Sequence, residues 1–278
     1  MKPDRIISSV NDNEIYIEFL PMFSKMWEKV YPGVPLEVAY ITDKEEDHPL
    51  IKRMREFATI HVYSPLDNVP SGIQAKASRM WLSSSFDEDI CMMADIDYFV
   101  MDSKYPQFWL DSVNDEDKFV SIAAHTYVGP LLGGKHPIQY TTAKSKTFKM
   151  IFNPNDLSYE DLFKSWFDLE VIHNKEKVNQ EYKNFSDESL IRALKYLWVK
   201  NGGDPELFVD VFREDGVPCY GDPKAKRRLD REGWDLNEEK LDSDWYVDCA
   251  PLRPFKKNIK EFRPLFKKFN LNEEDLLL

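Results

Sequence analysis

The sequence predicts an α/β fold in which a mostly parallel central sheet is flanked by helices. Short apolar runs of strand length alternate with longer runs whose apolar residues recur every three or four positions. This alternation requires right-handed crossovers and therefore a parallel sheet. In the first half of the chain we expect strands at Ile6–Val10, Leu36–Thr42, Thr59–Tyr63 and Ile90–Ala94, and helices at Glu14–Tyr31 and Gly72–Phe86.

The second half of the chain is less regular. We expect strands at Phe119–Ala124, Phe208–Phe212 and Trp245–Cys249, and helices at Tyr159–Ile172 and Asp187–Asn201. Repeated glycine and proline make residues 125–152 a loop-rich segment in this prediction. Residues 224–231 are expected to form a charged surface run, and residues 255–269 a basic, amphipathic, helical C-terminal extension. Without a repeat or a low-complexity linker, we expect one domain over 1–278.

Composition limits the possible partners and the compartment. The net charge of 37 − 49 = −12 argues against nucleic acid, because phosphate backbones need a basic surface. The three cysteines are widely spaced and form no C-x-x-C, which argues against structural zinc and fits a reducing compartment. The chain shows neither an apolar signal segment nor a transmembrane-length apolar run, so we expect a soluble, cytoplasmic protein.

Asp95 and Asp97 are the most informative pair in the sequence. They directly follow the apolar strand expected at Ile90–Ala94, where open α/β sheets bind ligands. Two carboxylates there suit Mg²⁺ or Mn²⁺, which would bridge a diphosphate and offset the charge on its oxygens. The alternative is that the two aspartates only end a strand in a turn.

The helix before this strand and the ends of the first two strands carry further candidates. Gln74, Lys76 and Arg79 lie within two helical turns, and Lys76 and Arg79 are expected on one face, where they could hold a diphosphate or a ribose. An exposed helix face is the alternative.

The ends of the first two strands carry candidates for contact with a nucleotide base. These are Ser9, Asn11 and Asp43, with a turn and helix cap as the alternative.

Three later positions could contribute to chemistry. Asp187 and Glu188 could act as a general base on an attacking hydroxyl, or could simply complement the dipole of a helix N-terminus. Asp248 could complete a metal site, or could lie on a charged edge strand. His125 follows an apolar strand and could contact a substrate, although a structural histidine is the alternative.

Several common enzyme motifs are absent from the sequence. It contains no G-x-x-x-x-G-K-[ST] and no G-x-G-x-x-G after the first strand, which disfavours P-loop enzymes and dinucleotide-binding Rossmann enzymes. It also contains no G-x-S-x-G and no H-E-x-x-H, which removes two common hydrolase types.

Four segments together resemble a known family. The opening strand followed by SVNDN, the second strand ending at Thr42-Asp43, the helix GIQAKASRM and the motif ADID resemble the GT-A-fold, DxD-containing nucleotide-sugar glycosyltransferases. YTTAKSKTF and FSDESL resemble, more loosely, the acceptor side of small GT-A enzymes, including those of large algal DNA viruses. The resemblance implies a GT-A-like, Rossmann-like domain with a nucleotide-sugar-binding half at 1–102, an acceptor-side half at 103–250 and a tail at 251–278.

The resemblance also implies roles for individual residues. Asp95 would contact the donor ribose and share the metal shell, and Asp97 would bind Mn²⁺ or Mg²⁺ directly. Ser9, Asn11 and Asp43 would lie near the base, Lys76 and Arg79 near ribose and phosphate, and Asp187 or Glu188 at the position of a catalytic base. Many members use a C-terminal histidine as a further metal ligand, but no histidine follows His173, which leaves Asp248 or water as the substitute.

The function implied is a metal-dependent glycosyltransferase. It would move a sugar from a UDP-sugar, or another nucleotide-diphosphate sugar, to a hydroxyl of a glycan or glycoprotein acceptor, with inversion. A viral enzyme of this kind would act in the host cytoplasm, and the glycine-rich segment at 129–134 would close over the donor. One alternative is a nucleotidyltransferase that makes nucleotide sugars, although SVNDNE lacks its glycine-rich basic loop. The other is a catalytically silent module that binds sugar or protein.

Overall fold

The main element of the fold is a seven-stranded, mixed sheet. The structure is a computed structural model that describes residues 1–102, 104–122, 136–173, 187–211, 227–243 and 245–278. In sheet order the strands are β3 (Thr59–Tyr63), β2 (Leu36–Ile41), β1 (Arg5–Asn11), β4 (Ile90–Met93), β7 (Thr141–Lys144), β6 (Phe119–Ile122) and β8 (Phe208–Val211). The first four are mutually parallel, β7 is antiparallel to both neighbours, and β6 pairs in parallel with β8. The mostly parallel α/β sheet predicted from the sequence is confirmed.

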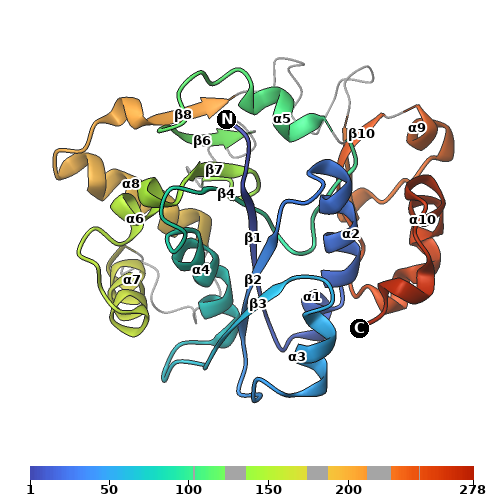
Figure 1. Cartoon of the computed structure of the whole chain (residues 1–278), viewed down its shortest axis with the longest axis horizontal. Helices are drawn as coiled ribbons and strands as arrows, with labels where there is room; N and C mark the ends of the chain where they lie inside the picture. The colour runs from blue at the N-terminus through green and yellow to red at the C-terminus, as the bar shows by residue number, and fades with distance from the viewer. Residues whose placement is uncertain (103, 123–135, 174–186, 212–226, 244) are drawn as a thin grey trace.

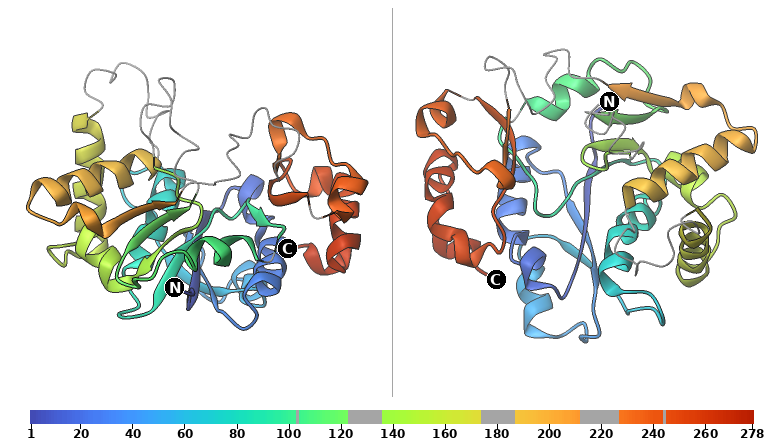
Figure 2. Two further views of the ribbon diagram at one scale, coloured as in Figure 1. Left: turned by 90° about the horizontal axis from the view of Figure 1, so that it is seen from above. Right: turned by 180° about the vertical axis from the view of Figure 1, so that it is seen from behind.

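Helices cover both faces of this sheet (Figures 1 and 2). One face carries α1 (Glu14–Ile17), α2 (Leu20–Val30) and α3 (Pro49–Met54). The other carries α4 (Ser71–Ser83), α6 (Ser145–Phe152), α7 (Tyr159–His173) and α8 (Asp187–Lys200). Each face buries its own apolar cluster because side chains alternate across a strand. Ile6 and Ile7 of β1, for example, belong to different clusters.

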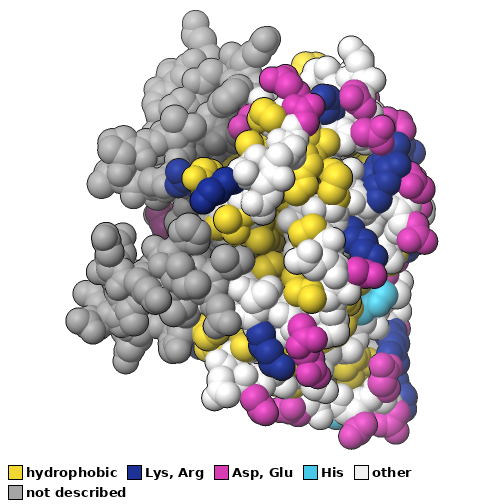
Figure 3. Space-filling view, turned by 90° about the vertical axis from the view of Figure 1, so that its left-hand side faces the viewer, with side chains coloured by type: hydrophobic (Ala, Val, Ile, Leu, Met, Phe, Trp, Pro, Cys, Tyr) yellow, Lys and Arg dark blue, Asp and Glu magenta, His cyan; other side chains and the backbone are white. Residues whose placement is uncertain are grey.

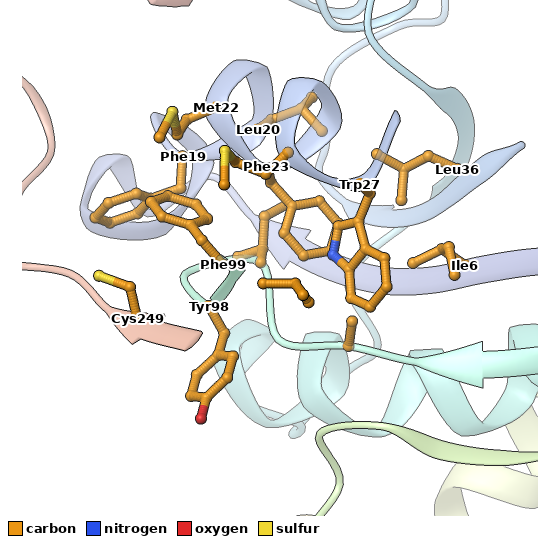
Figure 4. Close-up of a cluster of buried hydrophobic side chains, with 14 of the residues drawn as sticks. Ile6, Phe19, Leu20, Met22, Phe23, Trp27, Leu36, Tyr98, Phe99 and Cys249 are labelled. Atoms are coloured by element: carbon orange, nitrogen blue, oxygen red, sulfur yellow. The ribbon is translucent and has the colours of Figure 1, made fainter. Parts of the chain in front are cut away.

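The cluster beneath α2 is dominated by aromatic rings (Figure 4). Phe19, Phe23 and Trp27 project from the region of α2 toward the sheet, where Phe99 meets them. Phe19 and Phe99 have ring centroids 5.8 Å apart, and Phe23 and Trp27 have centroids 6.1 Å apart. Tilted and edge-on ring pairs of this kind add to the stabilisation that burial alone provides.

A second, three-stranded sheet joins the C-terminal region to the main body. Its order is β5 (Phe99–Val100), β10 (Tyr246–Ala250) and β9 (Arg227–Asp230), so β10 is the central strand and all five of its residues are buried. The prediction of a charged edge strand at this position is therefore wrong. Beyond it lie a 3₁₀ helix at Lys256–Phe262 and α10 (Arg263–Phe269), with α9 (Glu238–Asp242) packed against α10. These elements confirm the predicted helical extension, which buries Phe255, Phe262 and Phe266.

Two local predictions need correction. The helix expected over Glu14–Tyr31 is interrupted between α1 and α2, because Pro21 has no N–H to donate and is tolerated only in the first turn of a helix. Within the segment expected to be loop-rich, residues 141–152 instead form β7 and α6. The three-and-four spacing of Phe148, Ile151 and Phe152 accounts for the helix, and all three are buried. The helix α5 (Tyr105–Leu110) is not predicted from the sequence.

Some predictions fall outside the described residues. These are the glycine-rich segment at 129–134, His125 and part of the run at 224–231. Within the described residues, no helix combines the length and apolar character that a membrane crossing requires.

Figure 3 shows the side of the molecule on the left in Figure 1, where hydrophobic side chains gather in the middle of the face. Met150 of α6 and Tyr196 of α8 are exposed, and both helices lie on the left in Figure 1.

A buried histidine lies where β6, β7 and α8 meet. The His136 Nε2 atom is 2.8 Å from the Ser121 hydroxyl oxygen, and its Nδ1 atom is 3.4 Å from the Lys195 ammonium nitrogen. Burial, followed by the charge of Lys195, holds the pKa of His136 well below its usual range. The pKa of Lys195 is lowered by burial as well, although Asp210 opposes this shift. The imidazole is therefore neutral in the native protein.

This arrangement makes the stability of the protein depend on pH. Below pH 6.5 the unfolded chain protonates its histidine while native His136 stays neutral, so the unfolded state binds more protons. We expect the free energy of unfolding to fall by up to about 1.4 kcal/mol per pH unit below that point because of this residue. Urea unfolding between pH 5 and 7 should show a shallower pH slope for His136→Gln than for the wild type. Parallel slopes would contradict the assignment.

Candidate active site

The strands β1, β2 and β4 end at one edge of the sheet. Because they are parallel, their carboxyl ends bring together Asn11, Thr42 and the segment that contains Asp95. Neighbouring parallel strands place ligand-binding residues at such an edge. The ends of β1, β2 and β4 therefore lie at one edge of the sheet.

Arg79 is the centre of the site. Its guanidinium donates to the carboxylates of both Asp95 and Asp187. The Arg79 side chain is only 7% exposed, as is that of Asp187, while that of Asp95 is 38% exposed. The two carboxylates raise the pKa of Arg79 against the effect of burial, so the guanidinium stays charged. The structure thereby brings the first residue of α8 to the aspartate pair after β4.

The segment before β7 also reaches this point. The side-chain oxygen of Gln139 accepts a hydrogen bond of 2.7 Å from the backbone N–H of Asp95. The next residue, Tyr140, is buried in the left-handed region at a φ of 65°, which is a strained conformation for an aromatic residue. Strain of this kind costs about 1–3 kcal/mol and tends to accumulate at functional sites. The backbone N–H of His136 also donates to the Glu188 carbonyl. Residues 136–140 therefore contact both the turn at Asp95 and the start of α8.

Asp97 forms ion pairs with two arginines from the C-terminal region. Arg253 donates to one of its carboxylate oxygens through Nε at 2.6 Å and also through Nη2. Arg231 approaches the same oxygen at 2.8 Å. Asp97 is 6% exposed, and burial raises its pKa to about 6 although Arg253 opposes that shift. Arg253 also makes a cation–π contact, because its guanidinium lies 4.7 Å from the ring centre of Tyr16.

Asp248 belongs to the second sheet and has partners of its own. Its carboxylate accepts from Arg228 at 3.3 Å and from the Tyr140 hydroxyl at 3.4 Å, and it is 1% exposed. Among the residues that the structure describes, no three His, Cys, Asp or Glu side chains are placed to hold one metal ion. A third metal ligand would have to lie beside Asp95 and Asp97. The structure does not bring Asp248 to them.

The described contacts around the site balance in charge. Among the residues that the structure describes, four carboxylates take part, namely those of Asp95, Asp97, Asp187 and Asp248. They contact the guanidinium groups of Arg79, Arg228, Arg231 and Arg253. An anionic ligand at this edge would therefore meet arginines already gathered there.

A pocket opens beside the ends of β2 and β3. It has a volume of about 290 Å³ and is lined by Thr42, Asp43, Lys44, Glu45, Glu46, Val62 and Ser64. Asp43, predicted to contact a base, is exposed at its rim. The neighbouring Asp12 accepts hydrogen bonds from Tyr40, Lys44 and, at 2.8 Å, Thr42. Burial and these contacts compete, and the net effect lowers the pKa of Asp12.

The other predicted ligands of the first strand are less directly placed. Ser9 is half-buried on β1. The Asn11 amide donates to the Ser71 hydroxyl at 3.1 Å, and its side-chain oxygen accepts from the Asn13 N–H at 3.3 Å. Asn11 thus connects the end of β1 to the first residue of α4.

Two predictions on α4 need revision. Gln74 is fully buried, and its amide bonds with the Ser64 carbonyl, the Leu66 N–H and the Tyr159 hydroxyl at 2.8–3.0 Å. Its full burial and these three hydrogen bonds indicate a structural role. Lys76 is exposed while Arg79 is buried, so the two cations lie in different environments.

Sequence reasoning misses several residues at the site. Arg228, Arg231, Arg253 and Gln139 are not among the predicted site residues, and Arg228 and Arg231 fall in the predicted surface run. A local signal exists only for Arg228, which alternates with apolar Leu229 in a short run that can pair as a strand. The approach of Arg231 and Arg253 to Asp97 depends on contacts between segments more than 130 residues apart.

Comparison with known proteins supports the fold. No protein-family model and no curated protein matches the sequence. Among solved structures, the glycosyltransferase GlyE of Streptococcus pneumoniae TIGR4 is similar over 99% of this chain, with 12% identity and a TM-score of 0.50. This chain spans 63% of that protein's length. The match extends to the GT-A-like arrangement of sheet and helices.

Galactosyltransferase LgtC also matches. The structure of LgtC with donor and acceptor sugar analogues covers 68% of this chain and 70% of its own, at 18% identity and a TM-score of 0.43. A structure of an active-site mutant of LgtC covers 80% and 91%, at 17% identity and a TM-score of 0.42.

The Arg79 contacts yield a prediction about stability. Arg79→Ala leaves the buried carboxylate of Asp187 next to Asp95 without the charge between them, and we expect a loss of about 3 kcal/mol, as for a broken buried ion pair. Exposed Lys76→Ala on the same helix should change stability by less than about 0.5 kcal/mol. Urea unfolding at neutral pH measures both. Equal effects would show that Arg79 is not the residue that joins these segments.

Proposed function

We propose that this protein is a glycosyltransferase that uses a nucleotide-diphosphate sugar, in the first instance a UDP-sugar, as donor and a hydroxyl of a glycan or glycoprotein as acceptor. The observation that carries the proposal is the aspartate pair at the carboxyl end of β4, with arginines on both sides of it. A fold by itself does not define an activity, so the proposal depends on this site.

The arginines suit the departure of a nucleotide diphosphate. When the bond between the sugar and the diphosphate breaks, negative charge grows on the leaving group. Arg231 and Arg253 are partly exposed, at 23% and 32% of their side chains, so their guanidinium groups can receive phosphate oxygens. Positive groups fixed before the reaction lower its barrier because they need no rearrangement as charge develops.

The carboxylates of Asp95 and Asp97 also fit a divalent cation. Mg²⁺ and Mn²⁺ prefer oxygen ligands, and Mg²⁺ is commonly held by one or two carboxylates together with substrate phosphates and water. A two-carboxylate site therefore meets the requirement without Asp248. When bound, the cation would neutralise part of the diphosphate charge. Asp95 would in addition contact the donor ribose.

The position of the acceptor is proposed at the start of α8. Asp187 and Glu188 begin α8, and Arg79 donates to the Asp187 carboxylate. We propose that this pair supplies the general base for an inverting transfer. The base of the nucleotide would lie at the pocket rimmed by Asp43, near Ser9 and Asn11.

A nucleotidyltransferase is the weaker candidate. Such an enzyme must hold a nucleoside triphosphate close to the end of the first strand. Here that end is followed by Asp12, an ionised carboxylate fixed by Tyr40, Thr42 and Lys44. A negative group there opposes a triphosphate.

Donor hydrolysis tests the proposal directly. Purified protein with Mn²⁺ and a panel of nucleotide sugars should release free nucleotide slowly from one donor. Asp97→Asn should reduce this rate by at least about 100-fold, because the diphosphate charge then loses its cation. The matched control is exposed Lys25→Gln on α2, which should retain the wild-type rate within about 2-fold. No turnover of any nucleotide sugar by the wild type would contradict the proposal.

The products separate the remaining alternatives. Release of pyrophosphate from a nucleoside triphosphate and a sugar phosphate would instead identify a nucleotidyltransferase. With a working donor and acceptor, the anomeric configuration of the product, read from proton NMR coupling constants, should be inverted. Retention would contradict the role proposed for Asp187 and Glu188.

A further inference from the structure

The two arginines on Asp97 occupy the same atom that a metal ion would use. Arg253 and Arg231 both reach Oδ2 of Asp97. A divalent cation that approaches this oxygen meets two positive groups within hydrogen-bond distance of it. The cation and the guanidinium groups therefore compete for one carboxylate.

The same arginines are available to a diphosphate. Asp97 is buried, whereas both guanidinium groups belong to side chains that are 23% and 32% exposed. Arg253 keeps its support from Tyr16, through a 3.3 Å hydrogen bond to the hydroxyl and the contact with the ring, while its remaining donors are redirected. The guanidinium fork matches phosphate oxygens as well as carboxylate oxygens, so the same donors suit either partner.

Charge counting shows why the two ligands need each other. The four aspartates and four arginines of these ion pairs sum to zero charge. A divalent cation alone leaves an excess of about two positive charges in a partly buried site, and a diphosphate alone leaves a similar negative excess. Both ligands together restore the balance.

We propose that Arg231 and Arg253 form an exchangeable clamp on Asp97, which makes metal and nucleotide diphosphate bind as a cooperative pair. Without nucleotide the clamp excludes the metal from Asp97. The diphosphate draws the guanidinium groups away and exposes the carboxylate to the cation. This inference rests on the proposed function, since it takes a nucleotide diphosphate as the ligand of the site.

Mn²⁺ binding followed by electron paramagnetic resonance tests the clamp without any measurement of activity. Wild-type protein should bind Mn²⁺ weakly alone and at least about 10-fold more tightly with saturating UDP, within the range typical of coupled sites. The double variant Arg231→Gln/Arg253→Gln should bind Mn²⁺ alone several-fold more tightly than the wild type and should lose most of the gain from UDP. Asp97→Asn identifies the signal from this site, and exposed Lys257→Gln, which removes a lysine of the C-terminal extension, should behave as the wild type.

Circular dichroism and thermal melting establish that each variant is folded. Arg253→Lys, which keeps the charge but loses the two-pronged contact, should lie between the wild type and the double variant. The clamp is overturned if folded double variant binds Mn²⁺ alone no better than the wild type, or if wild-type affinity for Mn²⁺ is the same with and without UDP. Failure of UDP to bind the wild type under any condition would overturn the proposed function as well, which separates the two failures.

Discussion

The buried guanidinium of Arg79 is the interaction on which the site depends. It joins three segments that are remote in sequence: helix α4, the turn after β4 and the first residue of α8. Without a positive charge between them, Asp95 and Asp187 would repel each other in a poorly hydrated environment. The position of Asp95, and with it the geometry of the site, depends on this side chain together with Gln139, which accepts from the Asp95 backbone N–H.

The sequence predicts the first half of the fold well because its signals are local. The strands β1, β2, β3 and β4 are short apolar runs, and their order along the chain determines a parallel arrangement. The failures have specific causes. Pro21 divides a pattern that is otherwise helical, and the threonines of β7 look like loop residues until a neighbouring strand buries them.

The site is only partly predictable for a different reason. Asp95 and Asp97 stand out because they follow a buried strand, and Asp187 can be recognised as a carboxylate but not as a partner of Arg79. Arg228 faces Asp248 only through the pairing of β9 with β10, which the order of residues does not reveal. A run of arginine and lysine in a sequence has the same appearance whether the side chains point to water or to buried aspartates.

The amide of Gln74 has a consequence for the pocket beside β2 and β3. It holds the Ser64 carbonyl and the Leu66 N–H, so the wall that includes Ser64 is fixed before any ligand arrives. Little conformational entropy is then lost at Ser64 when a ligand enters, and more of the loss falls on Glu45 and Glu46, whose exposed side chains also line the pocket. Discrimination between ligands of this pocket should therefore reside at Ser64, and adaptation to different ligands at Glu45 and Glu46.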